Sequence, residues 1–193
     1  MRIRSGMRLW KSRVAKKVAL STTPLTPDAV ATHHAIMEAA IHLYYTDASP
    51  GFEVRFAFHS TQEIQAERDE RLYEAGAASA MMVLASIEAA FQIEYLSRCY
   101  ARQKDDLSRE LRKFYRNKGP RVSLADDLLR VWKQHGVLTE RLAGNIRSAF
   151  GYRNWLAHGR YYNPKLGREY DFADVYDLAC EVEEVLSSPN SMN

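Results

Sequence analysis

The chain has 193 residues, of which 46% are hydrophobic and 26% charged, and its formal net charge is +3. A chain of this size and composition can bury a core without disulfide bonds or a structural metal, and it is neither disordered nor collagen-like. Its two cysteines lie far apart in the sequence and form no CxxC pair, which argues against a disulfide framework or a cysteine zinc site and favours a reducing, cytoplasmic location.

The N-terminal segment is strongly basic. Residues 1–27 carry seven Lys or Arg and no acidic residue, which leaves 20 basic and 24 acidic residues in the remainder. We expect residues 1–26 to form a flexible basic arm. The alternatives are an amphipathic helix over Met7–Leu20 that is similar to a transit peptide, an arm that binds nucleic acid, and an extension upstream of a second start at Met7.

The first predicted helix runs from Thr26 to about Tyr45, because Thr26 offers a capping hydroxyl and Pro27 suits the first helical position. After a turn, apolar and polar residues alternate from Phe52 to Phe58. This period of two predicts a short extended segment near residues 52–59, which must find a partner in this chain or in a second copy. We therefore assign residues 27–60 to an accessory helix plus an extended segment.

Residues 61–187 are predicted to form a helical bundle, followed by a flexible tail over 188–193. Ser60 and Glu63 form a capping box that opens a long central helix ending near Arg102. The longest uncharged stretch in this helix has thirteen residues, fewer than the roughly 20 that a membrane span needs, so we expect no span there. Further helices are expected over residues 106–117, 123–134, 139–158 and 171–186. The predicted fold is all-α.

Positive charge is concentrated in two stretches of the predicted bundle. Residues 98–121 hold nine basic and three acidic residues, and residues 141–160 hold four arginines and no acidic residue. Residues 165–193 reverse this pattern, with seven acidic and two basic residues. Such segregation suits an anionic partner such as RNA, and solvated helix faces are the alternative interpretation.

The helix predicted over 139–158 ends in the sequence Arg-Asn-Trp-Leu-Ala-His. Helical periodicity places Arg147, Gly151, Asn154 and His158 on one stripe. Glycine weakens a helix, so its presence on the stripe would suit close approach of a partner backbone or a ligand. A histidine can take a proton from a ribose 2′-hydroxyl or give one to a leaving 5′-oxygen, and an arginine can hold the phosphate.

This motif, in an all-helical chain with a long preceding helix that carries Glu88, resembles the HEPN superfamily, in its predicted-ribonuclease branch. The resemblance covers about residues 62–186. It implies a homodimer in which the two motifs meet in a shared cleft and cleave RNA without a metal or cofactor, in a toxin or defence system with an antitoxin or other partner protein. By the same resemblance, Arg153 and His158 form the catalytic pair and Asn154 orients them.

Arg147 and Arg160 are candidate phosphate contacts, and Glu88 is the candidate partner of Arg153. Glu88 and Arg153 both lie on otherwise apolar helix faces, and an unpaired buried charge costs several kcal/mol, so we expect these two side chains to touch. The alternative to catalysis is that this pair is a buried brace and His158 only a helix C-cap. The chain would then be a catalytically inactive dimer that binds nucleotide, RNA or protein.

His34, Glu38 and His42 lie at positions i, i+4 and i+8 of the first predicted helix, a spacing that could place ligands on one metal ion. The sequence offers no obvious fourth ligand. We therefore favour a solvated polar face and predict neither a metal site nor a cofactor. Cys99 and Cys180 are expected to be buried thiols.

Overall fold

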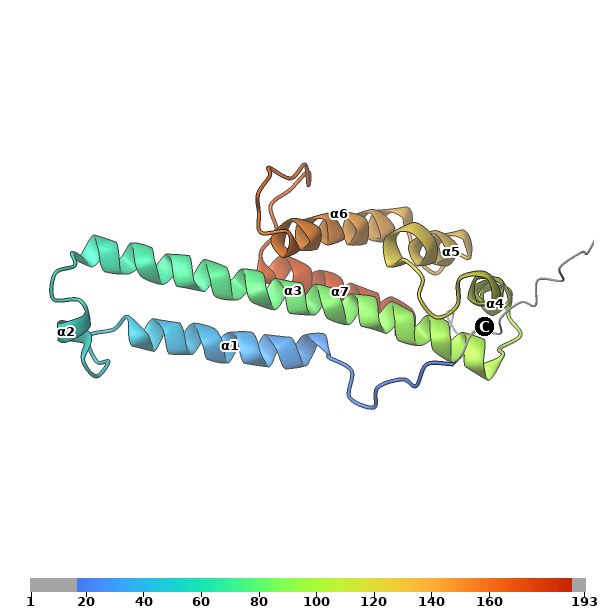
Figure 1. Ribbon diagram of the computed structural model, residues 1–193, viewed down its shortest axis with the longest axis horizontal. Helices are drawn as coiled ribbons and strands as arrows, with labels where there is room; N and C mark the ends of the chain where they lie inside the picture. Colours follow the sequence, from blue (N-terminus) through green and yellow to red (C-terminus); the bar gives the residue numbers. More distant parts are fainter. Residues whose placement is uncertain (1–16, 189–193) are drawn as a thin grey trace, which may run out of the picture.

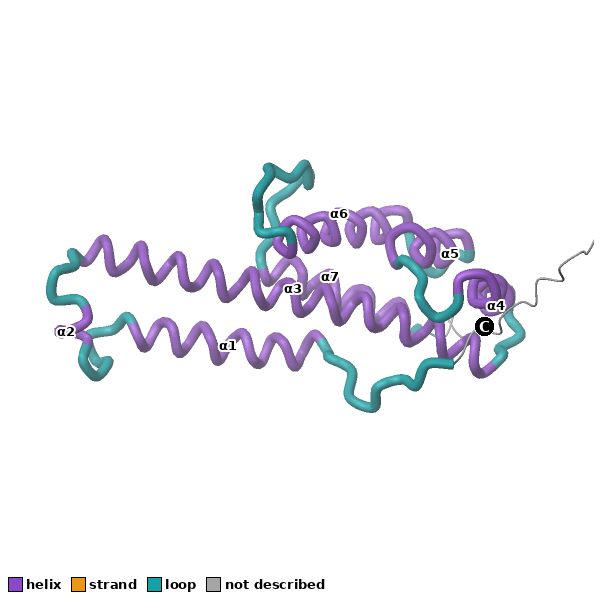
Figure 2. Tube along the Cα trace, in the orientation of Figure 1, coloured by secondary structure: helices purple, strands orange, loops and turns teal. Residues whose placement is uncertain are grey.

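The computed structural model describes residues 17–188, which form helices and connecting loops with no strand in that range (Figures 1 and 2). In chain order the helices are α1 (Pro27–Tyr44), α2 (Phe52–Arg55), α3 (Thr61–Ala101), α4 (Asp106–Lys118), a π-helical turn over Leu124–Leu128 that continues into α5 (Leu129–Gln134), α6 (Glu140–Ala157) and α7 (Phe172–Ser187). The predicted all-α bundle is confirmed.

Helix α3 is the axis of the molecule. Its 41 residues make a rod about 60 Å long, and it contacts α1, α4, α6 and α7. Helix α1 runs back along the N-terminal half of α3, whereas α6 and α7 pack over its C-terminal half and α4 and α5 gather at its end (Figure 1). The predicted accessory segment and the predicted bundle therefore share one long helix as their support.

Most of the buried apolar residues come from α3 and from the helices that follow it. The rings of Phe91 and Trp132 are both buried and meet edge to face, with centroids 5.7 Å apart. The Tyr95 hydroxyl is also buried and donates a hydrogen bond of 2.8 Å to the carbonyl of Gly119, which satisfies its polar end. Cys99 is buried as predicted, whereas Cys180 is only half-buried.

The predicted helix starts carry their predicted caps. The Thr26 hydroxyl accepts a hydrogen bond from the amide of Ala29, and Ser60 and Glu63 form the complete capping box at the start of α3. Thr139 caps α6 in the same way. A side-chain oxygen at the N-cap satisfies a backbone amide that the helix leaves without a partner, which is why these local patterns determine where helices begin.

The extended segment predicted near residues 52–59 is wrong, because the chain forms the short helix α2 there. Gly51 adopts the left-handed conformation, with φ of 76°, and turns the chain into one helical turn. The Arg55 guanidinium fixes this turn by donating to the carbonyl of Pro50 at 2.7 Å. The expected apolar face does not form, since Phe56 is buried whereas Phe58 is fully exposed.

Two predictions concern the ends of the chain. The possible helix over Met7–Leu20 lies mostly outside the described residues, and residues 17–20, which are described, are not helical. The predicted tail over 188–193 lies outside them except for Ser188. Neither the arm nor the tail is therefore tested.

Helix α3 is also long and apolar enough, by length and composition, to cross a membrane. A little under half of its most apolar window is buried inside the molecule. The core helix of a soluble protein has the same length and composition, so this feature is weak evidence for a membrane span.

Candidate functional site

Helix α6 stops abruptly after the motif. Gly159 and Arg160 both adopt left-handed backbone conformations, with φ of 75° and 58°. The Gly159 amide donates to the carbonyl of Leu156 at 3.1 Å, and the Arg160 amide donates to that of Trp155 at 3.0 Å. These bonds close the last turn of the helix and leave His158 as its C-cap residue.

The polar side chains of the predicted stripe are open to solvent. Arg147, Asn154 and His158 are all exposed. The backbone amide of His158 donates to the carbonyl of Asn154 at 3.0 Å, as expected of a C-cap. Within residues 17–188, no hydrogen bond or ion pair involves the exposed imidazole, so both of its nitrogens lack a partner in that range.

Arg153 and Glu88 touch, as predicted, with 3.4 Å between the Arg153 Nη2 and the Glu88 Oε2. Their predicted burial is wrong, because the two side chains are 34% and 37% exposed. The pair lies at the edge of the α3–α6 contact, where water reaches both groups. The guanidinium is therefore held by a carboxylate and by the nearby ring of Phe150, 5.8 Å away, yet it remains accessible from solvent.

Arg160, the second predicted phosphate contact, already has a carboxylate partner. Its two terminal nitrogens donate to the two oxygens of Glu74 on α3, at 2.7 and 2.6 Å. This pairing holds the pKa of the Glu74 carboxyl below its usual value. The guanidinium also lies 5.5 Å from the centre of the Tyr73 ring. Arg160 thus fastens the end of α6 to α3, and it would have to give up Glu74 to bind phosphate.

The loop between α6 and α7 explains why position 151 is a glycine. A Cβ at this position would lie 3.0 Å from Cδ2 of Leu166, which belongs to the connection between α6 and α7. The Ser148 hydroxyl donates to the carbonyl of Leu166 at 2.8 Å and holds this loop in place. The close approach expected on the stripe is therefore made by Leu166.

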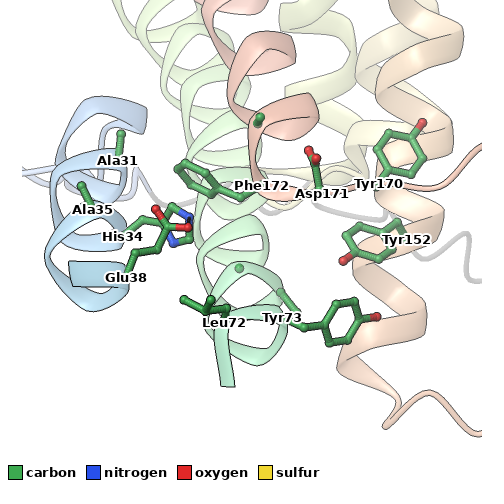
Figure 3. A pocket seen from close by; sticks show the side chains of 13 residues that line it. Ala31, His34, Ala35, Glu38, Leu72, Tyr73, Tyr152, Tyr170, Asp171 and Phe172 are labelled. Carbon is green, nitrogen blue, oxygen red and sulfur yellow. Dashed lines mark ion pairs between the residues drawn. The ribbon is translucent and has the colours of Figure 1, made fainter. Parts of the chain in front are cut away.

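A cavity of about 470 Å³ lies beside this end of α6, between α1, α3 and the start of α7 (Figure 3). Figure 3 shows the rings of Tyr73, Tyr152 and Tyr170 on one side and His34 and Glu38 of α1 on the other. The three tyrosines come from α3, from α6 and from the loop before α7. Sequence reasoning did not identify this cluster, because its members are far apart in the chain and show no common pattern.

Three aromatic rings stack behind the motif. Tyr152 lies between Tyr170 and Trp155, with centroid separations of 5.5 and 5.9 Å. Burial raises the pKa of the Tyr152 hydroxyl. The indole nitrogen of Trp155 donates to the carbonyl of Tyr162 at 2.6 Å, which ties the loop after the motif back to the helix. These contacts join the C-terminal end of α6 to the loop that follows it.

The solvated polar face predicted for α1 is wrong at His34, which is only 7% exposed. The start of α7 covers it, and the rings of His34 and Phe172 lie 3.9 Å apart. Its Nε2 lies 3.7 Å from the Glu38 Oε1, while its buried Nδ1 has no hydrogen-bond partner among residues 17–188. In that range no group of three or more His, Cys, Asp or Glu is arranged to hold a metal ion.

The end of α6 therefore presents one unpaired imidazole and, nearby on the same helix, one braced guanidinium, both accessible from solvent. An imidazole can transfer a proton, and a guanidinium can stabilise charge that develops on a phosphate. No protein-family model, curated protein or solved structure matches the chain.

Proposed function

We propose that the chain is a homodimeric HEPN-type ribonuclease that cleaves RNA without a metal ion, in the cytoplasm and in a toxin or defence role. The observation that carries the proposal is the end of α6, where the His158 imidazole is exposed and unpaired within residues 17–188. Arg153 nearby is oriented by Glu88 yet remains one-third exposed. Asn154, exposed one turn before the histidine, completes the polar surface that a ribose and phosphate would contact.

The proposed reaction is an attack of the ribose 2′-oxygen on the adjacent phosphorus. A basic imidazole takes the 2′-hydroxyl proton, the bond between phosphorus and the 5′-oxygen breaks, and an imidazolium protonates the leaving 5′-oxygen. The products are a 2′,3′-cyclic phosphate and a free 5′-hydroxyl. Arg153 stabilises the negative charge that builds up on the phosphate oxygens during the attack, and Arg147 is a further candidate phosphate contact.

Two imidazoles are needed in this scheme, because one histidine cannot accept and donate protons at the same moment. Each protomer contributes one His158, so the proposal requires a dimer in which the two α6 ends face each other. The exposure of Arg147, Asn154 and His158 is what such an arrangement needs, because it leaves their side of α6 available to a second copy and to RNA.

The test is incubation of the purified chain with total RNA, with and without EDTA. We expect wild type to cleave RNA in both conditions and His158→Ala to lower the rate about 100-fold or more, as the loss of a general acid and base does. His33→Ala is the matched control, since His33 is an exposed histidine on α1 outside the motif. Loss of cleavage in EDTA with rescue by a divalent ion, or an unimpaired His158→Ala variant, would contradict the proposal.

A second candidate is a catalytically inactive dimer that binds nucleotide, RNA or protein. It is favoured by the fact that Arg153 and Arg160 both have carboxylate partners already. In this case wild type would leave RNA intact yet still bind an RNA whose 2′-hydroxyls are methylated, and His158→Ala would bind it equally well.

A further inference from the structure

A second cavity, of about 760 Å³, lies at the far end of α3, where that helix ends and α4 runs past it. Three separate segments of the chain build it: the start of the described residues, the last turn of α3 and one face of α4. Its volume falls within the range of ligand-binding pockets. The cations that line it are Lys17, Arg102, Arg109, Arg112, Lys113 and Arg116.

This cavity is lined by six basic residues and no acidic one. Arg109 pairs with Asp106, and Arg112 donates to the backbone carbonyl of Gln103. Arg102, Lys113 and Arg116 have no carboxylate within ion-pair distance among residues 17–188. Like charges this close repel one another, so the arrangement is favourable when an anion occupies the cavity.

Arg98 directly precedes Cys99 of the cavity lining and shows how an arginine with a structural role is surrounded in this chain. It is completely buried, and it pairs with Glu94 at 2.6 Å and with Asp105 at 3.3 Å. The Ser108 hydroxyl accepts a further hydrogen bond from it at 3.2 Å. An arginine that serves the fold is thus neutralised by two carboxylates, whereas within residues 17–188 only Arg109 among the cations of the cavity has a carboxylate partner.

The cavity also has an aromatic wall. The rings of Tyr100 and Tyr115 meet edge to face, with centroids 5.9 Å apart, and both are partly exposed. The Tyr100 hydroxyl accepts a hydrogen bond from the Val18 amide at 2.9 Å, and the Lys17 ammonium lies 4.8 Å from the ring centre. Aromatic rings combined with a cationic groove are the usual lining of a site for single-stranded nucleic acid.

The spacing of the basic residues on α4 suits an extended strand of nucleic acid better than a single phosphate group. They recur at positions i, i+3, i+4 and i+7 of the helix, so they line one face over about 10 Å. The sixteen residues before Lys17 carry six more basic residues and no acidic one.

The cavity is distinct from the α6 motif. Glu74, which binds Arg160, and Cys99, which lines the cavity, both lie on α3 and are 25 residues apart. At a helical rise of about 1.5 Å per residue, this separation is about 37 Å. Glu88, which contacts Arg153 of the motif, lies 11 residues before Cys99, or about 16 Å along the helix. A single phosphate in the cavity therefore does not reach the motif of the same protomer.

We propose that this cavity, the α3–α4 cavity, binds the phosphate backbone of single-stranded RNA at a point remote from the cleavage site. The choice of RNA over another polyanion rests on the proposed function. The α3–α4 cavity thereby selects RNA strands long enough to reach from it to a motif, and it discriminates against dinucleotides.

The test uses the full chain and a 2′-O-methylated RNA of about 20 nucleotides, which binds but cannot be cleaved through its 2′-oxygens. We expect Lys113→Gln with Arg116→Gln to weaken binding by about tenfold and to lower its dependence on salt. The matched control is Arg121→Gln with Lys165→Gln, which removes two exposed charges outside the cavity and should change the affinity less than about twofold. Equal losses in the two double variants would overturn the proposal.

Arg102→Gly separates a binding role from a structural one. Arg102 caps α3 in the left-handed conformation, with φ of 54°, which glycine adopts more readily than arginine. We expect this variant to lose affinity for RNA while its midpoint of thermal unfolding is unchanged or higher. Unchanged affinity for RNA, or a loss of affinity accompanied by a lower midpoint, would contradict the binding role for Arg102.

Two further outcomes separate this inference from the proposed function. Binding that depends on the cavity without cleavage of ordinary RNA would overturn the function and keep the cavity as an RNA site. Cleavage of RNA without cavity-dependent binding would overturn the inference about the cavity and keep the proposed function.

A competition experiment tests the kind of ligand. Displacement of the RNA by an equal concentration of ATP would show that the cavity takes a free nucleotide, which would also contradict the inference.

Discussion

His158 and Arg153 lie five residues apart at the end of α6 and have different surroundings. The imidazole is exposed and has no side-chain partner among residues 17–188. In the proposed reaction it would exchange protons with the ribose of a bound RNA. The guanidinium has one carboxylate neighbour at 3.4 Å, which limits its rotation without removing it from solvent. In the proposed reaction, the open imidazole transfers protons and the oriented guanidinium stabilises the charge that develops on phosphate.

The partial exposure of Arg153 and Glu88 determines how much their contact stabilises the fold. Half-exposed ion pairs contribute about 1 kcal/mol or less, well under the several kcal/mol of a buried pair. In a double-mutant cycle of Glu88→Gln and Arg153→Met, we expect a coupling of about 0.5–1 kcal/mol in the free energy of unfolding. Strict additivity would show that the pair does not interact in solution.

Glu74 gives the fold a dependence on acid. Its carboxyl has a lowered pKa in the folded chain because Arg160 donates two hydrogen bonds to it. Its contribution to stability is therefore present at pH values above its ordinary pKa of 4.5 and is lost as the pH falls through the lowered value. Measured between about pH 6 and pH 3, the free energy of unfolding should fall less steeply for Glu74→Gln than for wild type. Parallel curves would contradict this role.

The contacts of individual residues were predictable only in part. Glu88 and Arg153 could be paired from sequence because each is a charge on an apolar helix face. Their exposure could not be predicted, since it depends on how far α6 overlaps α3. Arg160 and Glu74 are 86 residues apart in the sequence, and no local pattern predicts their pairing.

The ends of the helices follow local rules, and the sequence therefore predicts them well. Thr26, Ser60 and Thr139 each cap the helix that they were expected to open, because the side chain and the amide that it satisfies are three residues apart. The conformation of the segment Phe52–Phe58 could not be predicted from such a local pattern. Its alternation is short, and a left-handed glycine and an arginine that binds backbone carbonyls turn it into a helix instead.

The connection between α6 and α7 can be tested through Gly151. In a helix interior alanine is favoured over glycine by about 1 kcal/mol, but here a Cβ would meet Leu166 at 3.0 Å. We expect Gly151→Ala to leave the free energy of unfolding nearly unchanged in wild type. In a Leu166→Ala background the same change should stabilise by about 1 kcal/mol. Equal effects in both backgrounds would show that Leu166 does not pack on Gly151 in solution.

At the scale of the whole molecule, α3 separates two regions that could contact RNA. The C-terminal end of α6, which carries the motif, lies beside the middle of α3 (Figure 1). The last turn of α3 lines the α3–α4 cavity. The motif is incomplete in one copy, because the proposed reaction needs two imidazoles. The protein should therefore function as a dimer.

Light scattering coupled to size-exclusion chromatography tests this assembly. We expect a mass twice the 22.1 kDa of the chain at micromolar concentration, because the motif side of α6 is exposed in one copy. Excess His158→Ala should also suppress the activity of wild type, since mixed dimers hold only one imidazole. A monomer, or wild-type activity that excess variant does not affect, would count against the shared site.

The chemistry of the cleaved ends tests the central claim most directly. A short RNA incubated with wild type in EDTA should give fragments whose masses correspond to a 2′,3′-cyclic phosphate on one side and a 5′-hydroxyl on the other. A single 2′-deoxynucleotide at the cleaved position should abolish the reaction, and His158→Ala should form both ends at least about 100-fold more slowly than wild type. Fragments with a 3′-hydroxyl and a 5′-phosphate, or the same fragments from His158→Ala at the wild-type rate, would contradict the account.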